Sequence, residues 1–201
     1  MITVGIAGGS GSGKSTLARL LAKSINNCVL LQQDSYYKDF SECPHKINFD
    51  HPDSLDLDSL KLHLRLLAEG KPIEQPLYDF TTHRRLCSFR RIDPQPVVVL
   101  DGTLILTDPQ ICSFITLKIF IDTAADIRFI RRLRRDRAER GRSVESIVEQ
   151  YLTQVKPMHE LLVEPCKVIA DIVVRNDDEK ISSLERIATI VAAWIQQRLN
   201  T

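Results

Sequence analysis

The chain has 201 residues, of which 43% are hydrophobic, so it can bury its own core and suits one domain over residues 1–201. Its 27 basic and 26 acidic residues leave a net charge of +1, which favours neither a nucleic acid nor a membrane as partner. Five scattered cysteines without a C-x-x-C pair disfavour a disulfide framework and a zinc site. With an N-terminal apolar run too short for a signal peptide, this composition predicts a cytoplasmic protein.

A glycine-rich segment near the N-terminus fits the pattern G-x-x-x-x-G-K-[ST]. It reads Gly8, Gly9, Ser10, Gly11, Ser12, Gly13, Lys14 and Ser15, and Thr16 follows. Residues 2–7 before it predict a buried strand, and apolar spacing over residues 15–26 predicts a helix after it. In that setting backbone N–H groups bind a polyphosphate, Lys14 bridges the β- and γ-phosphates, and the Ser15 hydroxyl holds Mg²⁺. The sequence therefore predicts a nucleotide site.

Further strands and helices alternate along the chain. Four more compact apolar runs predict strands at residues 28–31, 97–100, 117–121 and 171–174. Apolar stripes predict helices through Leu60, Leu64 and Leu67, ending at Gly70, and through Leu184, Ile187, Ala188, Val191 and Ile195. This alternation predicts an α/β fold with a doubly wound parallel sheet of about five strands, whose ligands gather at the carboxyl ends of the strands.

Residues 72–96 interrupt the alternation and are rich in Pro, Asp, Thr and Arg. Two short extended runs there predict a β-hairpin that could act as a substrate flap. The runs are residues 77–81 and 86–90. Strand alternation puts Tyr78 and Phe80 on one side, and His83 follows shortly after. The two aromatic rings could then flank a flat base, and a neutral His83 imidazole could donate or accept a hydrogen bond at the edge of that base. Aromatic rings that only fill the underside of the flap fit this spacing equally well.

Residues 126–150 form a second insertion, an arginine-dense helical stretch broken at Gly141 that predicts a mobile lid. Its arginines are Arg128, Arg131, Arg132, Arg134, Arg135, Arg137, Arg140 and Arg142. We expect Ile127, Ile130 and Leu133 to anchor the segment to the body. Three of the arginines, Arg132, Arg135 and Arg142, fall near one helical side, where they could close over transferring phosphates. A nucleic-acid groove or a plain solvated face is the alternative.

Two aspartates come directly after predicted strands. Asp34 follows the second strand and Asp101 the third, so both are expected at the carboxyl edge of the sheet, near the γ-phosphate. Phosphoryl transfer to a hydroxyl needs one carboxylate to orient that hydroxyl and take its proton, and another to organise the metal shell. We assign the first role to Asp34 and the second to Asp101. Either carboxylate would also suit a cap of the following helix.

Taken in order, these motifs resemble those of the uridine kinase family (uridine-cytidine kinases), which are P-loop kinases, over residues 2 to about 174. Besides the phosphate loop and Asp101-Gly102, the segments that carry the resemblance are Gln33-Asp34-Ser35-Tyr36-Tyr37-Lys38, Asn48-Phe49-Asp50-His51-Pro52, Tyr78-Asp79-Phe80 with His83 and Arg84, Phe120-Ile121-Asp122-Thr123, Arg131-Arg132 with Arg135-Asp136, Glu139-Arg140-Gly141-Arg142-Ser143, and Gln150-Tyr151 with Lys156-Pro157. The phosphate loop alone indicates only nucleotide binding, whereas the aspartate- and arginine-centred segments are specific to the family.

The resemblance implies ATP- or GTP-dependent, Mg²⁺-assisted phosphorylation of uridine and cytidine to their 5′-monophosphates. It implies that Asp34 acts on the ribose 5′-hydroxyl and that Asp50 binds the 2′- and 3′-hydroxyls, which would reject deoxyribonucleosides. The remaining implied roles are a pyrimidine pocket of Tyr78, Phe80 and His83, nucleoside contacts by Arg132, Arg142 and Gln150, and phosphate contacts by Arg135 and Arg140. The family is also homotetrameric and inhibited by pyrimidine triphosphates.

The chain departs from the family pattern at two places. A strand end that usually reads Glu-Gly is Asp101-Gly102, one methylene shorter, which puts a direct metal contact in question. The loop after the last strand, usually similar to Pro-Arg-Gly-Gly and near the nucleotide base, reads Arg175-Asn176-Asp177-Asp178. This second departure leaves the choice between ATP and GTP open.

Other functions remain as alternatives. A P-loop kinase for another small alcohol, such as nicotinamide riboside, ribulose 5-phosphate or pantothenate, shares the phosphate loop, but the set Tyr78, Phe80 and His83 favours a nucleoside. A GTPase switch needs a guanine-reading N-K-x-D motif, which the sequence lacks. A nucleic-acid-binding regulator built on the arginine-rich helix would bind RNA or DNA with a strong dependence on salt.

Overall fold

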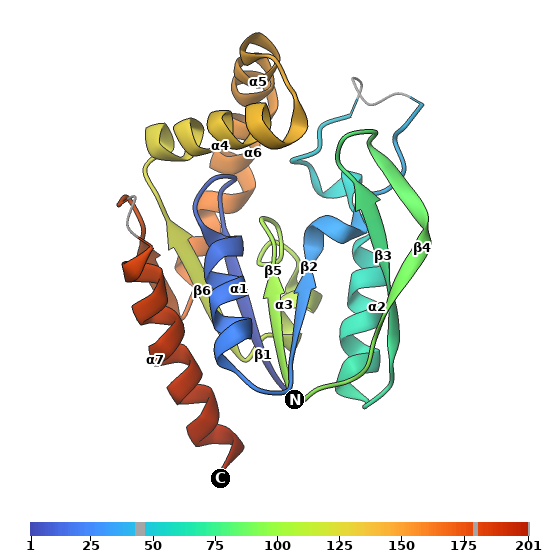
Figure 1. The fold of residues 1–201 in the computed structure, drawn as a ribbon, viewed down its shortest axis with the longest axis vertical. Helices are drawn as coiled ribbons and strands as arrows, with labels where there is room; N and C mark the ends of the chain where they lie inside the picture. The colour runs from blue at the N-terminus through green and yellow to red at the C-terminus, as the bar shows by residue number, and fades with distance from the viewer. Residues whose placement is uncertain (43–46, 179–180, 201) are drawn as a thin grey trace.

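The computed structural model describes residues 1–42, 47–178 and 181–200. Its main sheet has five parallel strands in the order β2-β5-β1-β6-β7 (Figure 1). They are β1 (Ile2–Gly8), β2 (Cys28–Gln32), β5 (Val97–Asp101), β6 (Leu117–Asp122) and β7 (Ile172–Arg175). The predicted parallel sheet is confirmed, and each strand lies within one residue of its predicted bounds. β1 is the central strand, so the glycine-rich segment leaves the sheet at its middle.

Helices cover both faces of this sheet. They are α1 (Lys14–Ser24), α2 (Leu57–Ala68), α3 (Pro109–Phe114), α4 (Ala125–Arg140), α5 (Val144–Gln150), α6 (Lys156–Met158) and α7 (Ser182–Leu199). The first helix ends at Ser24 instead of the predicted residue 26, because the backbone is extended at Ile25 and left-handed at Asn27, with a φ of 56°. Within the described residues, no helix combines the length and the apolar composition that crossing a bilayer requires.

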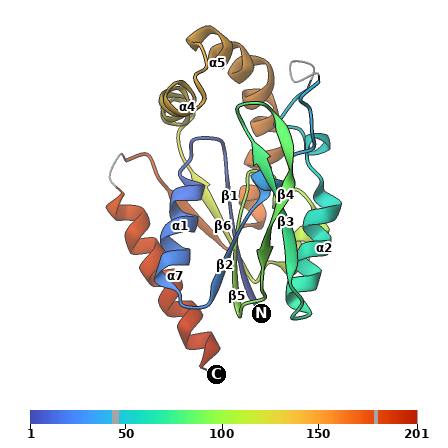
Figure 2. The ribbon, with the colours of Figure 1, turned by 45° about the vertical axis from the view of Figure 1, so that its right-hand side comes forward.

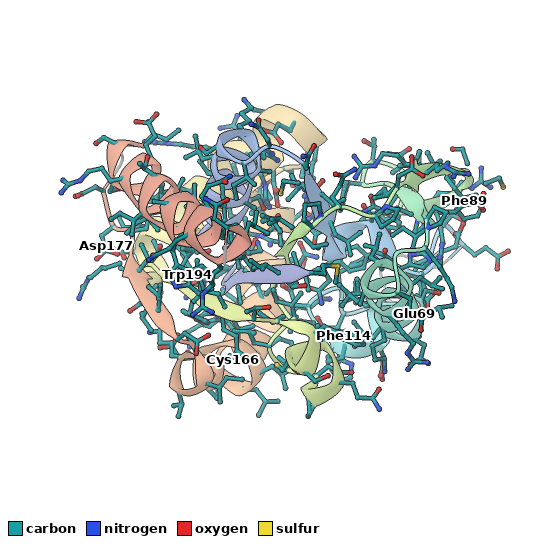
Figure 3. The ribbon with its side chains drawn as sticks, turned by 90° about the horizontal axis from the view of Figure 1, so that it is seen from below. Glu69, Phe89, Phe114, Cys166, Asp177 and Trp194 are labelled. Atoms are coloured by element: carbon teal, nitrogen blue, oxygen red, sulfur yellow. The ribbon has the colours of Figure 1, made fainter. Side chains whose placement is uncertain are left out.

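Two hydrophobic clusters explain the layered arrangement. Successive strand residues point to opposite faces, so Val97 and Val99 pack with the apolar sides of α1 and α7, while Val98 and Leu100 pack with α2 and α3. Figure 3 shows these layers from below, with Trp194 of α7 on one side of the sheet and Phe114 of α3 on the other. Because the strands are parallel, the residues that follow β1, β2 and β5 lie together at the carboxyl edge of the sheet.

The predicted hairpin is present as β3 (Ile73–Asp79) and β4 (Arg84–Ile92), which pair antiparallel and stand beside α2 (Figure 2). The predicted first run, residues 77–81, was wrong in its bounds, because β3 ends at Asp79. The Asp79 carboxylate accepts hydrogen bonds from the Thr81 N–H at 2.8 Å and the Thr82 hydroxyl at 2.7 Å, and this side-chain turn stops the strand. Phe80 consequently lies in the turn and not on the strand face predicted for it.

The arginine-dense stretch forms α4 and α5, which lie above the carboxyl edge of the sheet (Figure 1). Gly141 separates them with a φ of 62°, so Arg142 lies beyond the end of α4 and not on one helical side with Arg132 as predicted. Of the three predicted apolar anchors, Ile127 and Leu133 are half-buried, but Ile130 was wrong, since it is 42% exposed. The buried positions of α4 are Arg128, Arg132 and Asp136. They can be polar because they have polar partners: Arg128 donates to the Thr123 carbonyl, and Arg132 donates to the Ser10 hydroxyl.

The four cysteines that the structure describes are free thiols. They are Cys28, Cys87, Cys112 and Cys166. Cys43 lies outside the described residues. Burial raises the pKa of the Cys28 and Cys166 thiols to about 11, so neither is a reactive thiolate at neutral pH.

Candidate active site

The glycine-rich segment forms a loop between β1 and α1 that only glycine can complete at certain positions. Gly11 has a φ of +83°, and a Cβ atom there would lie 2.3 Å from the Arg128 carbonyl oxygen. The Ser12 N–H donates to the Gly9 carbonyl at 3.0 Å, which closes the turn. Lys14, only 8% exposed, begins α1, where the helix N-terminus adds partial positive charge. The loop therefore has the backbone shape and the charge of an anion cradle.

Gly11→Ala should destabilise the protein more than Gly70→Ala does. Gly70 is a matched control because its φ is +74° and nothing lies within 4 Å of an added Cβ, so alanine there adds only the backbone strain of about 1–2 kcal/mol. Alanine at position 11 adds the same strain and a clash with backbone. We expect thermal unfolding to give a larger loss for Gly11→Ala; equal losses at both positions would contradict the close packing of the loop against α4.

A cavity of about 640 Å³ opens beside the loop, between the hairpin turn and the lid segment. Its charged lining residues are Lys14, Arg19, Asp34, Asp79, Arg131, Arg135, Glu139 and Arg140. This size lies in the range of small-molecule sites, and the excess of basic over acidic side chains in the lining favours an anionic ligand. We refer to it as the donor cavity.

Asp34 and Asp101 are brought together by strand pairing. β2 and β5 are neighbours, with Gln32 opposite Asp101, so the turn Gln33–Tyr36 carries Asp34 to the same edge of the sheet as Asp101. Burial raises the pKa of Asp101, which is 4% exposed, and the charge of Lys14 opposes the rise. Asp34 lines both the donor cavity and the adjoining pocket described below. The predicted helix-cap alternative finds no support at Asp101, which shares a hydrogen bond with Ser15.

Ser15 and Asp101 fit a Mg²⁺ ion. The Oδ1 atom of Asp101 is buried and has no partner among the described residues. The Ser15 hydroxyl lies beside the Asp101 carboxylate, and the phosphate cradle is the third feature of the site. In the described part of the chain, no group of three or more His, Cys, Asp or Glu residues could hold a metal by itself. A hard cation bound here would therefore take further oxygen ligands from phosphate and water.

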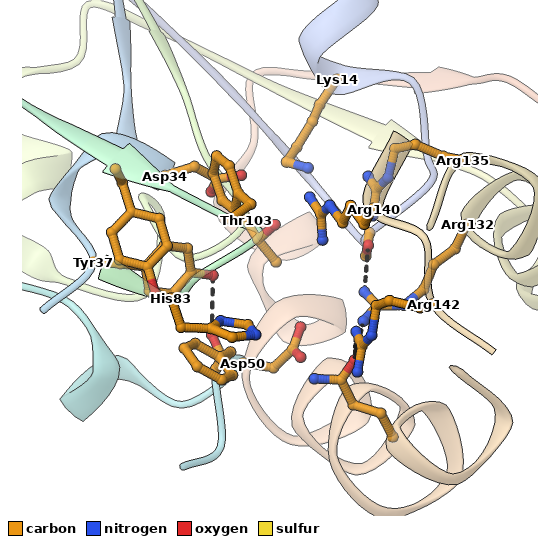
Figure 4. Close-up of a pocket in the computed structure, with 15 residues that line it drawn as sticks. Lys14, Asp34, Tyr37, Asp50, His83, Thr103, Arg132, Arg135, Arg140 and Arg142 are labelled. Carbon is orange, nitrogen blue, oxygen red and sulfur yellow. Dashed lines mark hydrogen bonds between the residues drawn. The ribbon is translucent and has the colours of Figure 1, made fainter. Parts of the chain in front are cut away.

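A second pocket, which we call the acceptor pocket, joins the donor cavity at Asp34 (Figure 4). One wall carries Tyr37, Phe49, Asp50, Tyr78, Phe80 and His83, and the facing wall carries Arg132, Arg135, Arg140, Arg142 and Gln150. The Phe49 and His83 rings stack with centroids 4.6 Å apart, and the Tyr37 and Tyr78 rings lie 5.2 Å apart. The free volume is about 70 Å³, so the two walls must separate to admit a ligand of nucleoside size.

The titratable groups of the acceptor pocket have shifted pKa values. Burial raises the pKa of Asp50, and the Arg132 charge opposes this rise. Burial also lowers the pKa of His83, assisted by Arg142 and Arg140, so this imidazole is neutral at pH 7. Burial raises the pKa of Tyr78 to about 12, and its hydroxyl has no partner among the described residues. The wall thus presents two aromatic faces, one neutral imidazole and one unpaired hydroxyl.

The lid arginines converge on one carboxylate, that of Asp136, which is fully buried. Arg135 donates to Asp136 Oδ1 through Nε at 2.9 Å and Nη2 at 2.8 Å. Arg132 Nε lies 3.5 Å from Oδ2, and Arg140 Nη1 lies 3.5 Å from Oδ1. Burial disfavours the charged carboxylate, but these three cations outweigh it and hold the pKa of Asp136 below its usual value.

Four further contacts fix the lid side of the acceptor pocket. The Gln150 side-chain oxygen accepts from Arg132 Nη2 at 2.7 Å and from Arg142 Nη1 at 2.6 Å. Arg132 Nη1 also donates to the Ser10 hydroxyl of the phosphate loop at 2.8 Å. Arg140 lies over the Phe80 ring, with Cζ 4.9 Å from the centroid, so the lid touches the hairpin.

The structure brings together every residue that the sequence assigned to the acceptor side, from Asp34 and Asp50 to Gln150, in one pocket lining. Sequence reasoning missed Tyr37, Phe49 and Thr103, which line the same pocket, and Asp136, which organises its arginines. A signal existed for Asp136, because it is the lone acid between Arg131 and Arg137, four residues from Arg132 and from Arg140.

Comparison with known proteins identifies the family. Residues 3–182 match the phosphoribulokinase / uridine kinase family. A uridine kinase of Alkaliphilus metalliredigens is 43% identical over 203 residues, covering 98% of each chain, and one of Bacillus cereus (strain AH187) is 39% identical over 205 residues, covering 99% of this chain and 97% of the relative. The chain belongs to the phosphoribulokinase / uridine kinase family. It is thus a kinase of a nucleotide-using family.

The fold agrees with this membership. The phosphoribulokinase of Rhodobacter spheroides superposes with a TM-score of 0.68 at 16% identity, covering 87% of this chain and 69% of that one. At that identity the likeness concerns the fold alone, a parallel sheet with a phosphate loop at its middle.

Proposed function

We propose that this protein transfers the γ-phosphate of ATP or GTP to the 5′-hydroxyl of uridine and cytidine, giving the nucleoside 5′-monophosphates used in pyrimidine salvage. The observation that carries the proposal is the position of Asp34, which lines the donor cavity and the aromatic acceptor pocket at once. Relatives about 40% identical over nearly the whole chain are named uridine kinases, which favours this substrate class.

The proposed phosphoryl transfer depends on the residues at the junction of the two cavities. Asp34 orients the acceptor hydroxyl and takes its proton, while the phosphate loop, including Gly8, Gly9 and Ser10, holds the donor through backbone N–H groups. Lys14, Arg135 and Arg140 neutralise the charge on the phosphates. Mg²⁺, held by Ser15 and Asp101, directly or through water, would supply further charge neutralisation between phosphate oxygens.

The acceptor pocket supports a ribonucleoside. Tyr78 and Phe80 offer faces for a flat ring, and the neutral His83 can donate to or accept from the base edge, which tolerates a carbonyl or an amino group. Asp50, buried in the same wall, is the candidate partner for the 2′- and 3′-hydroxyls. Arg132, Arg142 and Gln150 complete the contacts from the lid.

A substrate panel tests the proposal. We expect uridine and cytidine to be phosphorylated with ATP or GTP, and 2′-deoxyuridine and 2′-deoxycytidine to be poorer substrates by roughly 10²-fold or more in kcat/KM, because Asp50 would be left unpaired. Nicotinamide riboside, ribulose 5-phosphate and pantothenate belong in the same panel, with mass spectrometry of the products. Faster turnover of any of these three than of uridine would refute the proposal; a purine nucleoside serves as the control for base selection.

We also propose a homo-oligomer, a tetramer by analogy with the family, working in the cytoplasm. Exposed apolar side chains gather at the β7 edge of the sheet and in the segment before it, where Val168 is 88% and Val173 49% exposed. Light scattering after gel filtration measures the mass and so tests the oligomer.

A further inference from the structure

The peptide that joins Ser12 to Gly13 is held from outside the phosphate loop by two side chains. The Asn176 amide nitrogen Nδ2 donates to the Ser12 carbonyl at 2.7 Å. The Thr123 hydroxyl shares its one proton between the same carbonyl, at 3.0 Å, and the Asn176 carbonyl, at 3.2 Å. Both residues are buried, with Asn176 4% and Thr123 5% exposed. They come from the ends of β7 and β6, so two separate strands fix one peptide of the loop.

The fixed carbonyl determines where the next N–H group points. In a planar trans peptide the C=O and N–H bonds are antiparallel, so a Ser12 carbonyl turned toward Asn176 and Thr123 turns the Gly13 N–H the opposite way. That direction is toward the inside of the loop, where the donor phosphates are proposed to bind. Gly13 has a φ of +99°, and a Cβ atom there would lie 2.5 Å from Asn176 Nδ2, so Asn176 packs directly against this peptide and requires glycine at position 13.

The same two residues also connect the loop to the lid. Arg128 Nε donates to the Thr123 carbonyl at 3.0 Å, and Arg131 Nη1 donates to the Asn176 carbonyl at 3.0 Å. Both arginines lie near the start of α4, so the segment that carries the lid arginines rests on the residues that hold the loop. The Asn176 N–H donates to the Asp122 carbonyl at 2.8 Å, which fixes its own backbone.

We propose that Asn176 and Thr123 are positioning residues that aim the Gly13 N–H group at the phosphates of the donor nucleotide. This inference rests on the proposed function only in that the loop binds a nucleotide. Asn176 stands in the loop where this chain departs from the usual Pro-Arg-Gly-Gly sequence. Neither residue lines the acceptor pocket, and both act through the backbone of the loop.

The test compares variants of Asn176 and Thr123 in nucleotide binding, measured by calorimetry with a non-hydrolysable ATP analogue and Mg²⁺. Asn176→Asp removes the donor and puts an acceptor against the Ser12 carbonyl, so we expect affinity to fall about 10-fold or more. Thr123→Val should weaken binding about 3- to 10-fold, while Thr123→Ser, which keeps the hydroxyl, should bind as the wild type does. Asn200→Asp, at the far end of α7, is the matched control.

Steady-state kinetics with uridine separates positioning from general damage. We expect KM for ATP to rise in Asn176→Asp and Thr123→Val while KM for uridine stays within about twofold, because the acceptor pocket is untouched. Unchanged analogue affinity in both variants would overturn the inference, as would equal rises of both KM values. If the wild type binds the analogue but does not phosphorylate uridine, the proposed function fails, and the binding series still decides the role of Asn176.

Discussion

Asp34→Asn should lower kcat for uridine phosphorylation by about 10²–10⁴-fold, because an amide cannot take the proton of the acceptor hydroxyl. Asp34 lines both cavities, and no other carboxylate that the structure describes does so. Asparagine keeps the shape of the side chain, so calorimetry should find affinity for ATP within about twofold of the wild type. The measurement is a coupled assay at saturating uridine and ATP.

Asp58→Asn is a suitable control for Asp34→Asn. Asp58 is 93% exposed on α2, where its partner is Lys61, and the substitution should leave kcat unchanged. A kcat for Asp34→Asn close to that of Asp58→Asn would exclude Asp34 as the base. A loss of both activity and ATP binding would also count against the assignment, since it would mean that Asp34 supports the fold of the site instead of the reaction.

Asp136→Asn should destabilise the protein. The neutral amide leaves Arg132, Arg135 and Arg140 close together without their shared negative partner, and Arg135 loses two charge-assisted hydrogen bonds. We expect a loss of about 2 kcal/mol in unfolding free energy, equal to about 4–8 °C in Tm for a chain of this size. Because Arg135 and Arg140 line the donor cavity, kcat should fall as well.

The pH dependence gives a second measurement on Asp136. Its pKa in the folded protein lies below the usual value of 3.8, so the stabilisation is complete above the unfolded value and disappears as the pH falls through the folded one. The stability difference between wild type and Asp136→Asn should therefore be constant near neutral pH and shrink below about pH 4. A difference that does not shrink in acid would contradict the charge-based account.

Added sulfate and a control substitution complete this test. Sulfate should raise the Tm of Asp136→Asn more than that of the wild type, because an anion can replace the missing carboxylate among the arginines. Asp178→Asn, on the exposed loop after β7, should behave as the wild type in both measurements. An equal sulfate effect on Asp136→Asn and wild type would show that the arginines do not depend on this carboxylate.

Much of the candidate active site could be predicted from the sequence, because the elements that form it follow local sequence rules. The glycine spacing and the flanking apolar runs predicted the loop between β1 and α1, and compact apolar runs predicted all five strands. Parallel strands share one carboxyl edge, so Asp34 and Asp101 could be expected to lie together before any contact was known.

The hairpin and the lid were predicted as elements but not in detail. The side-chain turn at Asp79 ended β3 before Phe80, although the alternation of residues continued past it in the sequence. Apolar periodicity also gave α4 the wrong inner face. Hydrophobic patterns report which residues avoid water, and they carry no information on buried polar groups whose partners are distant in sequence.

The sequence by itself determined the phosphate loop and the sheet, and it predicted most of the residues that line the acceptor pocket. Only the tertiary structure decided how the charged parts are held, with Asp136 inside the arginine cluster and Asn176 against the Ser12 carbonyl, 164 residues away along the chain. The physical reason is that a buried polar side chain is stable only when its hydrogen bonds are satisfied, and the partner is supplied by packing. No local pattern encodes a partner as distant along the chain as Ser12 is from Asn176.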